Sequence, residues 1–230
     1  MVTGAVAAMP SEARWLAAGG ATAPSPDRQG PYLRVRASGT GRRRAREAAE
    51  ALLTEGASRL LSWGIAGGLD PRLASGALLL PREVAADPAI PCDADWHSRV
   101  RARLAPHWPP AEGAILSQDG PVTSPREKRR LAQAWGATAL DQETLGVAEA
   151  ARAAGVPLLV VRGVVDPADR ALPPGVAASL GADGSVAGWH LLRTLAASPG
   201  QARALPGLAR DLWRARATLR QAARLLGPQW

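Results

Sequence analysis

The apolar stretch from Pro157 to Val165 constrains the fold of this chain more than any other segment. It consists of small and branched aliphatic residues, and Arg162 is the one charge that interrupts it. Such a run, between a glycine turn and Asp166, is typical of a strand buried on both faces of a sheet. It is shorter than the roughly 20 residues needed to cross a bilayer, and no other apolar stretch reaches that length. The sequence therefore predicts a protein built around a buried sheet.

Shorter strand patterns alternate with helix patterns along the rest of the chain. The further predicted strands are Val2–Ala8, Tyr32–Ala37, Arg59–Trp63, Ala77–Val84, Ala114–Ser117 and Ala137–Leu140. Helices are predicted from Gly41 to about Glu55, over Asp93–Leu104, from Ser124-Pro125 onward, over Glu143–Ala154 and from about 206 to 226. This alternation predicts an α/β fold whose mixed, mostly parallel central sheet is covered on both faces. Residues 1–230 fit one domain of ordinary size.

Charge and cysteine content limit the class of partner. The formal net charge is +8, and residues 201–230 hold six arginines against one acid, Asp211. No helix-turn-helix, zinc-finger or RNA-recognition pattern accompanies this charge, so we expect no nucleic-acid partner. The single cysteine, Cys92, excludes an internal disulfide and is consistent with a reducing cytoplasm.

Glycines and carboxylates follow several predicted strands at the point where each strand ends. Glu12 follows the first strand, Glu143 follows the strand that ends at Leu140, and Asp166 follows Val165. The glycine segments Gly39-Thr40-Gly41 and Gly64-Ile65-Ala66-Gly67-Gly68 follow two further strands. Ligands of open α/β sheets bind at the carboxyl ends of strands, and the sequence therefore predicts a ligand site there.

Glu143 and Asp166 each have a structural and a functional interpretation. Glu143 heads a helix, where the helix dipole stabilises a carboxylate and where Asp141 competes as the cap; the alternative is that Glu143 accepts hydrogen bonds from sugar hydroxyls. Asp166 ends a buried strand, where a raised pKa would suit a general acid. The alternative there is a structural ion pair of Asp169 with a neighbouring arginine.

Other site chemistries lack their motifs. The dinucleotide fingerprint fails because Arg44 stands where its third glycine belongs, and no phosphate-binding P-loop occurs. No Gly-x-Ser-x-Gly segment supports serine-hydrolase chemistry. The three histidines are scattered without ligand spacing, so we expect no metal and no cofactor.

Taken together, these segments resemble the purine/uridine phosphorylase superfamily, in particular its methylthioadenosine/adenosylhomocysteine nucleosidase branch. Four blocks match in order within residues 1–172. They are Ala7-Ala8-Met9-Pro10-Ser11-Glu12, Ser38-Gly39-Thr40-Gly41, Gly64-Ile65-Ala66-Gly67-Gly68-Leu69, and Asp141-Gln142-Glu143-Thr144 followed by Val160-Val161-Arg162-Gly163-Val164-Val165-Asp166. The resemblance implies a single-domain three-layer sandwich, a homo-oligomer, and cleavage of the N-glycosidic bond of a purine nucleoside-like substrate, adenine being the expected base.

The resemblance also implies a role for each matching residue. Asp166 would protonate the base nitrogen as it leaves, and Glu12 would orient the nucleophilic water. Glu143 would hold the ribose hydroxyls, with Gln142 beside it, and Arg162 would lie near the nucleophile. The segment formed by Ile65, Ala66 and Gly67 would lie against the substrate. The oxocarbenium-like sugar formed on cleavage is stabilised by such carboxylates.

Three departures from the family pattern leave the substrate and the nucleophile open. The common Met-Glu pair is Gln142-Glu143, the serine before the acid is Val165, and the serine of the glycine motif is Ile65. Hydrolysis is favoured because Glu12 would repel a phosphate dianion. The arginines at 42–44 argue for inorganic phosphate as co-substrate. A nucleoside-binding protein without catalysis is the third alternative.

A closer likeness is to the hopanoid-associated phosphorylases, proposed adenosylhopane nucleosidases. The segments Ser62–Pro71 and Asp166-Pro167-Ala168-Asp169-Arg170 carry it, together with the Arg-rich tail. This likeness implies adenosylhopane as the substrate, and a methylthioadenosine-type nucleoside is the alternative.

The predicted helix at 206–226 has two interpretations. Leu208, Leu212, Trp213, Leu219 and Leu226 are predicted to lie near one side, with arginines around them. The helix either packs on the domain or contacts an anionic membrane surface. We accordingly expect a cytoplasmic protein, with peripheral contact at the inner membrane face under the second interpretation. The role of the Pro-rich loop at 19–30 stays open.

Overall fold

The computed structural model of the chain describes residues 1–19, 32–171 and 205–227. The loop at 19–30 lies outside these residues except for Gly19, so its predicted role is not addressed. One domain over 1–230 also stays a prediction, because the described residues do not cover the whole chain.

Nine strands form one sheet in the described part of the chain. The strands are β1 (Val2–Ala7), β2 (Tyr32–Ala37), β3 (Arg59–Gly68), β4 (Leu78–Leu79), β5 (Glu83–Ala85), β6 (Ile90–Pro91), β7 (Ala114–Ser117), β8 (Ala137–Asp141) and β9 (Leu158–Val164). The helices are α1 (Pro10–Ala17), α2 (Arg42–Thr54), α3 (Ala94–Leu104), α4 (Pro125–Trp135), α5 (Thr144–Ala154) and α9 (Leu205–Leu226).

Strand β3 belongs to both halves of the sheet. Its first part pairs in parallel with β1 and β9, and its last residues, Gly67 and Gly68, pair antiparallel with β8. Beyond β8 the sheet continues through β7 and β5 to β6, and β2 and β4 flank β1 and β9. Five strand pairings are parallel and three are antiparallel. The predicted mixed, mostly parallel sheet is confirmed.

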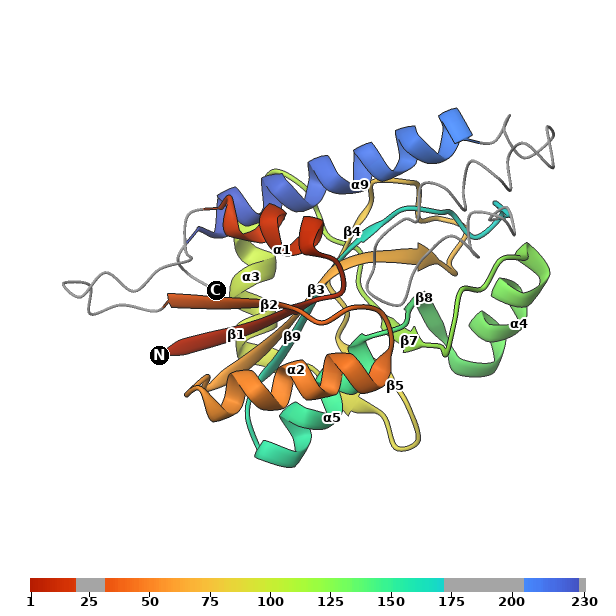
Figure 1. Cartoon of the computed structure of the whole chain (residues 1–230). Coiled ribbons are helices and arrows are strands. Elements are labelled where there is room, and N and C mark those ends of the chain that lie inside the picture. The colour runs from red at the N-terminus through yellow and green to blue at the C-terminus, as the bar shows by residue number, and fades with distance from the viewer. Residues whose placement is uncertain (20–31, 172–204, 228–230) are drawn as a thin grey trace, which may run out of the picture.

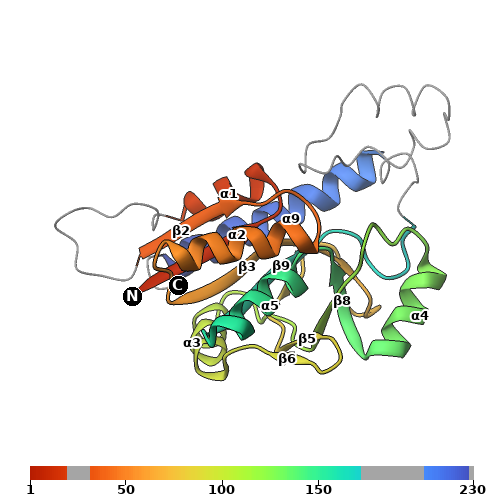
Figure 2. The same ribbon diagram turned by 60° about the horizontal axis from the view of Figure 1, so that its bottom comes forward.

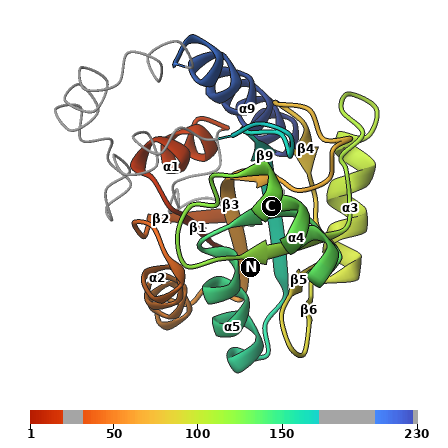
Figure 3. The same cartoon turned by 90° about the vertical axis from the view of Figure 1, so that its right-hand side faces the viewer.

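Helices cover both faces of the sheet, as Figures 1 and 3 show. Helices α2 and α5 pack on one face, and α1, α3 and α9 pack on the other. Alternating strand residues feed the two cores, since Val6 and Val160 face α2 and α5 whereas Ala5, Leu159 and Val161 face α9. The predicted α/β three-layer sandwich is therefore confirmed.

Helix α4 packs apart from these two layers, against β7 and β8 (Figure 2). Its start follows the sequence prediction, because the Ser124 hydroxyl accepts a hydrogen bond from the Glu127 amide and Pro125 takes the first helical position. Asp93 caps α3 in the same way, through the Trp96 amide. These local predictions are confirmed.

Two element predictions are wrong, and two elements are missed, helix α1 and strand β6. The glycines after Trp63 do not end the strand, because β3 continues through them to reach β8. The predicted strand Ala77–Val84 is split around Leu80-Pro81 into β4 and β5. Helix α1 has no counterpart among the predicted helices. The first two errors share a cause, since long-range pairing rather than local pattern sets where these strands begin and end.

The apolar side of α9 also differs from the prediction. Leu219 and Leu226 are buried against α1 and α3, but Leu212 and Trp213 are 40% and 65% exposed. Small residues complete the buried face, namely Ala215, Thr218, Ala222 and Ala223. The helix thus packs on the domain and still presents large apolar side chains outward. Among the described residues, no helix is long and apolar enough to cross a bilayer.

The contact between α2 and α5 depends on one glycine. A Cβ added at Gly146 would lie 2.1 Å from the carbonyl oxygen of Arg42. We expect Gly146→Ala to lower the free energy of unfolding by about 1–3 kcal/mol, because the helices must separate. Gly207→Ala in α9 is the control, because nothing lies closer than 4.0 Å to its added Cβ. Urea unfolding of both variants tests this, and equal stability of the two would contradict it.

Candidate active site

The end of strand β3 forms the floor on which the predicted site residues meet. A Cβ added at Gly64 would lie 2.7 Å from Oε1 of Glu12, and one at Gly67 would lie 3.1 Å from Oδ1 of Asp166. The Gly68 amide also donates to the Asp166 carbonyl at 2.8 Å. Side chains at 64 and 67 would occupy the space of the two carboxyl groups. The glycines therefore allow close approach of two protein carboxyl groups to the strand.

Glu12 is buried on the first turn of α1, with 1% of its surface exposed. Its Oε2 accepts a hydrogen bond from the Met9 amide at 2.8 Å, and its Oε1 accepts one from the Ile65 amide at 2.9 Å. Burial raises the pKa of the Glu12 carboxyl above its usual range, and the two amides oppose this shift. The amides hold both oxygens in place while each retains a lone pair for another donor.

Asp166 follows β9 and is held by a lysine from α4. Nζ of Lys128 lies 2.6 Å from Oδ2 of Asp166. Burial raises the pKa of the Asp166 carboxyl, and the Lys128 charge opposes the rise. The Asp166 side chain is largely desolvated, which favours its protonated form, and it remains 16% exposed, so a ligand can reach it. A general acid requires both properties.

Glu143 precedes α5 and binds the glycine turn before α2. Its Oε1 accepts a hydrogen bond from the Gly41 amide at 2.9 Å, so the anion that this turn meets is a side chain of the protein itself. Glu143 makes no capping hydrogen bond; Asp141 accepts from the Thr144 amide instead, at 3.2 Å. Burial, together with the charge of Asp141, raises the pKa of Glu143 to about 7.

A buried ion pair lies beneath these carboxylates. The Arg162 guanidinium binds Oδ2 of Asp141 through Nε at 2.9 Å and Nη2 at 2.7 Å. It also donates to Ser62 and Thr144, both at 2.7 Å, and Thr144 and Ser117 donate to Asp141. The Arg162 charge lowers, and the Asp141 charge raises, the pKa values of both Glu12 and Glu143. The pair therefore acts on both residues electrostatically.

The structure brings most of the sequence-predicted residues together. Glu12 lies against the Ile65 amide, Asp166 against Gly67, and Glu143 is close enough to Glu12 for their charges to interact. Gln142 is half-buried beside Glu143, and its backbone amide donates to Oε2 of Glu143 at 3.3 Å.

Two of the predicted contact residues have buried side chains. Arg162 is 2% exposed and its guanidinium binds Asp141, close enough to Glu12 for its charge to act on that carboxyl group. The Ala66 side chain lies in the core, and its carbonyl accepts from Val165 at 2.9 Å. The suggested ion pair of Asp169 with a neighbouring arginine is also wrong, because Arg170 pairs with Asp211 and Arg162 with Asp141.

Lys128 is the residue that the sequence predictions miss. It is the only lysine of a chain rich in arginine, and this singularity is the one signal that points to it. Its partner lies 38 positions later in the chain, so no local pattern reveals the pair. Among residues 1–19, 32–171 and 205–227, no group of three or more histidine, cysteine or acidic side chains is arranged to hold a metal ion.

Solved structures with the same fold include a futalosine hydrolase and two nucleosidases. Futalosine hydrolase of Helicobacter pylori strain 26695 is 18% identical with a TM-score of 0.75, over 100% of this chain and 98% of that chain. The 5'-methylthioadenosine/S-adenosylhomocysteine nucleosidase of Neisseria meningitidis, in complex with methylthio-immucillin-A, is 16% identical with a TM-score of 0.74, over 100% and 99%. The corresponding Helicobacter pylori enzyme with butyl-thio-DADMe-Immucillin-A is 19% identical with a TM-score of 0.69, over 96% and 97%.

Family membership follows from a sequence comparison. A search of curated proteins finds no match for the chain. A family model described as the Phosphorylase superfamily matches residues 3–186, which include every carboxylate of the site. The chain belongs to the Phosphorylase superfamily.

Proposed function

We propose that this protein hydrolyses the N-glycosidic bond of a purine nucleoside. The observation that carries the proposal is the meeting of two separately held carboxyl groups, Glu12 and Asp166, on the backbone of β3. The similar solved structures, a futalosine hydrolase and methylthioadenosine/adenosylhomocysteine nucleosidases, support the same class of reaction.

Asp166 supplies the proton in the proposed mechanism. Its proton passes to a purine ring nitrogen as the bond between that base and the sugar carbon breaks. The base then leaves as a neutral molecule rather than as an anion, which lowers the barrier to cleavage. The raised pKa of Asp166 favours the protonated form that this step uses.

Glu12 and Glu143 act on the sugar side. Glu12 accepts a proton from a water molecule, whose oxygen forms the new bond to the sugar carbon. Glu143 accepts hydrogen bonds from sugar hydroxyls, and the negative charge of both stabilises the oxocarbenium-like sugar. After the reaction Glu12 holds a proton taken from water, Asp166 lacks the proton that it gave to the base, and proton exchange with solvent restores both groups.

Hydrolysis is proposed over phosphorolysis because the site is acidic. Glu12 lies where the nucleophile must approach and would repel a phosphate dianion. Arg42 and Arg43, predicted as possible phosphate ligands, form ion pairs with Glu149 and Glu47. Arg162 is engaged with Asp141. Phosphate as a co-substrate is therefore the less favoured alternative.

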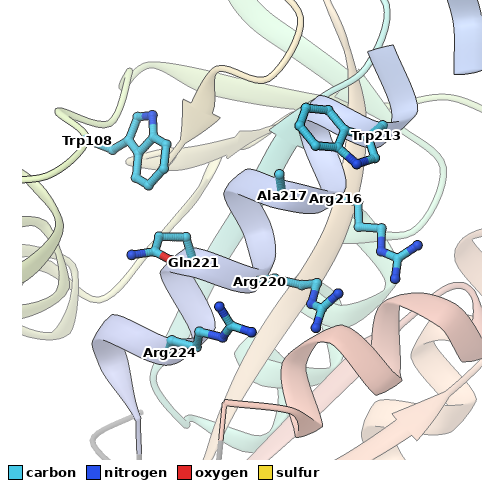
Figure 4. A pocket seen from close by; sticks show the side chains of 7 residues that line it. All are labelled: Trp108, Trp213, Arg216, Ala217, Arg220, Gln221 and Arg224. Atoms are coloured by element: carbon cyan, nitrogen blue, oxygen red, sulfur yellow. The ribbon is translucent and has the colours of Figure 1, made fainter. Parts of the chain in front are cut away.

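We propose further that the substrate is a lipid-linked nucleoside, adenosylhopane, taken from a membrane surface. The support is an exposed aromatic and cationic face on α9, beside a surface hollow of about 420 Å³ (Figure 4). The hollow is lined by Trp108, Trp213, Arg216, Ala217, Arg220, Gln221 and Arg224. Trp108 and Trp213 are 41% and 65% exposed, and aromatic residues flanked by arginine suit the boundary of an anionic bilayer. A cytoplasmic location, and a homo-oligomer, are further parts of the proposal.

The central test is adenine release by the Asp166→Asn variant. Release from adenosine, methylthioadenosine and an adenosylhopane mimic is measured with and without phosphate. We expect phosphate-independent release by the native protein and a loss of about 10²–10⁴-fold in the variant, because the leaving base is no longer protonated. Asp169→Asn, an exposed acid three positions later, is the matched control and should keep its activity. Absence of release from every substrate by folded native protein would overturn the proposal in favour of a binding function.

The pH dependence follows from Glu143. Burial raises its pKa to about 7, well above the usual range of a glutamate, and its ionised form is the stronger acceptor for hydroxyl hydrogen bonds. We therefore expect kcat/KM to fall as pH decreases below about 7, since Glu143 then becomes protonated. The pH profile of adenine release measures this. An acidic limb near 4.5 would show that the carboxylate is not desolvated during catalysis.

Membrane contact is tested on point variants, because deletion of α9 would expose the buried Leu219 and Leu226. We expect Trp213→Ser to weaken sedimentation with anionic lipid vesicles several-fold, because an interfacial aromatic side chain is lost. Trp135→Ser on α4 is the control, since Trp135 is exposed to 43% but lies outside the α9 face. Equal sedimentation of the two variants would exclude α9 as the contact.

A further inference from the structure

We propose that Lys128 is a positioning residue for the general acid, holding one oxygen of Asp166 so that the other faces the leaving base. This inference rests on the proposed function. Its starting point is that Lys128 is 0% exposed, although lysine side chains are among the least often buried. A buried ammonium is costly unless its charge and its donors are compensated.

The compensation comes almost entirely from the segment that carries the acid. Nζ of Lys128 donates to Oδ2 of Asp166 at 2.6 Å, to the Pro167 carbonyl at 2.8 Å and to the Arg170 carbonyl at 3.2 Å. A longer contact reaches the Asp166 carbonyl at 3.5 Å, so the three protons of the ammonium group are shared among four acceptors. Lys128 thus fixes the backbone from 166 to 170 as well as the carboxyl group itself.

The geometry distinguishes the two oxygens of Asp166. Lys128 holds Oδ2, whereas Oδ1 is the oxygen nearer to Gly67 on β3. The Asp166 backbone is also bound to β3, because the Gly68 amide donates to the Asp166 carbonyl at 2.8 Å, and a Cβ at Gly67 would lie 3.1 Å from Oδ1 and 3.4 Å from Oδ2. A carboxyl group fixed between an ammonium and a strand presents one defined oxygen for proton transfer.

The charges that act on Asp166 from the described residues come from two elements. Lys128 acts from α4, and Arg170 acts from the same loop as Asp166 while its guanidinium pairs with Asp211 on α9. Strand β3 contributes backbone only. Loss of the Lys128 charge should therefore raise the pKa of Asp166 further, because Lys128 is the largest influence that opposes burial.

If Lys128 only stabilised the fold, its loss would slow the cleavage of every substrate to the same extent. If it positions the acid, its loss would slow only those substrates whose leaving group must be protonated. Two substrates therefore separate the structural role from the positioning role. Adenosine, or the nucleoside preferred by the native protein, needs protonation of its leaving base. A p-nitrophenyl riboside releases a stable phenolate and needs no acid. Rates with both substrates are compared for native protein, Asp166→Asn, Lys128→Gln and Lys128→Arg. Arg129→Gln, which removes an exposed charge one position away on α4, is the matched control.

We expect Lys128→Gln to lower nucleoside cleavage about 10²-fold while p-nitrophenyl riboside cleavage changes little, as in Asp166→Asn. The basic limb of its pH profile for nucleoside cleavage should move to higher pH, because Asp166 stays protonated up to a higher pH once the Lys128 charge is lost. Lys128→Arg keeps the charge and should keep the position of this limb. Arg129→Gln should match the native protein with both substrates.

The inference would be overturned if the folded Lys128→Gln variant lost activity equally toward both substrates, or lost activity toward neither. If Lys128→Gln does not fold, the Lys128→Arg variant provides the test. Equal losses of activity toward both substrates, or a shift in the basic limb of its pH profile, would overturn the positioning role. Failure of the native protein to cleave either riboside would instead overturn the proposed function.

Discussion

Close packing of two carboxyl groups against the backbone of one strand is the contact on which the site depends. Glu12 and Asp166 lie beyond different strands, and they meet because β3 continues between them without side chains at Gly64 and Gly67. The same continuation carries β3 into its pairing with β8, which ends at Asp141, two residues before Glu143. Strand β3 therefore joins the two halves of the sheet, and it determines where the acidic residues of each half lie.

Each buried acid has a different source of compensation, and this difference separates their chemical roles. Asp141 is paired with Arg162 and is hydrogen-bonded by Ser117 and Thr144, so it is a structural anion. Asp166 has an ammonium partner. Glu12 is held by two backbone amides, and Glu143 by the amide of Gly41 with a longer contact to that of Gln142. Backbone dipoles oppose the effect of burial at Glu12 and Glu143, an ammonium opposes it at Asp166, and the pKa values of all three carboxyl groups remain raised.

The sequence predicts those features that depend on neighbours along the chain. The caps at Asp93 and Ser124, the turn at Gly155 and the strand over Leu158–Val164 follow from local pattern, and each is present. The glycine and acid positions at strand ends indicate where the site lies. The pairing of β3 with β8, the ion pair of Lys128 with Asp166, and the engagement of Arg162 by Asp141 join distant segments. Such contacts are decided by packing of the whole chain, which propensity and spacing do not report.

The ion pair between Arg170 and Asp211 joins the loop that carries Asp166 to α9. The Asp211 side chain is 1% exposed, so loss of its partner would leave a carboxylate buried without compensation. Replacement of either residue alone is therefore expected to destabilise the contact between this loop and α9. The two residues are therefore expected to be inherited together, and a lineage that replaces α9 would have to rebuild the support of its acid loop at the same time.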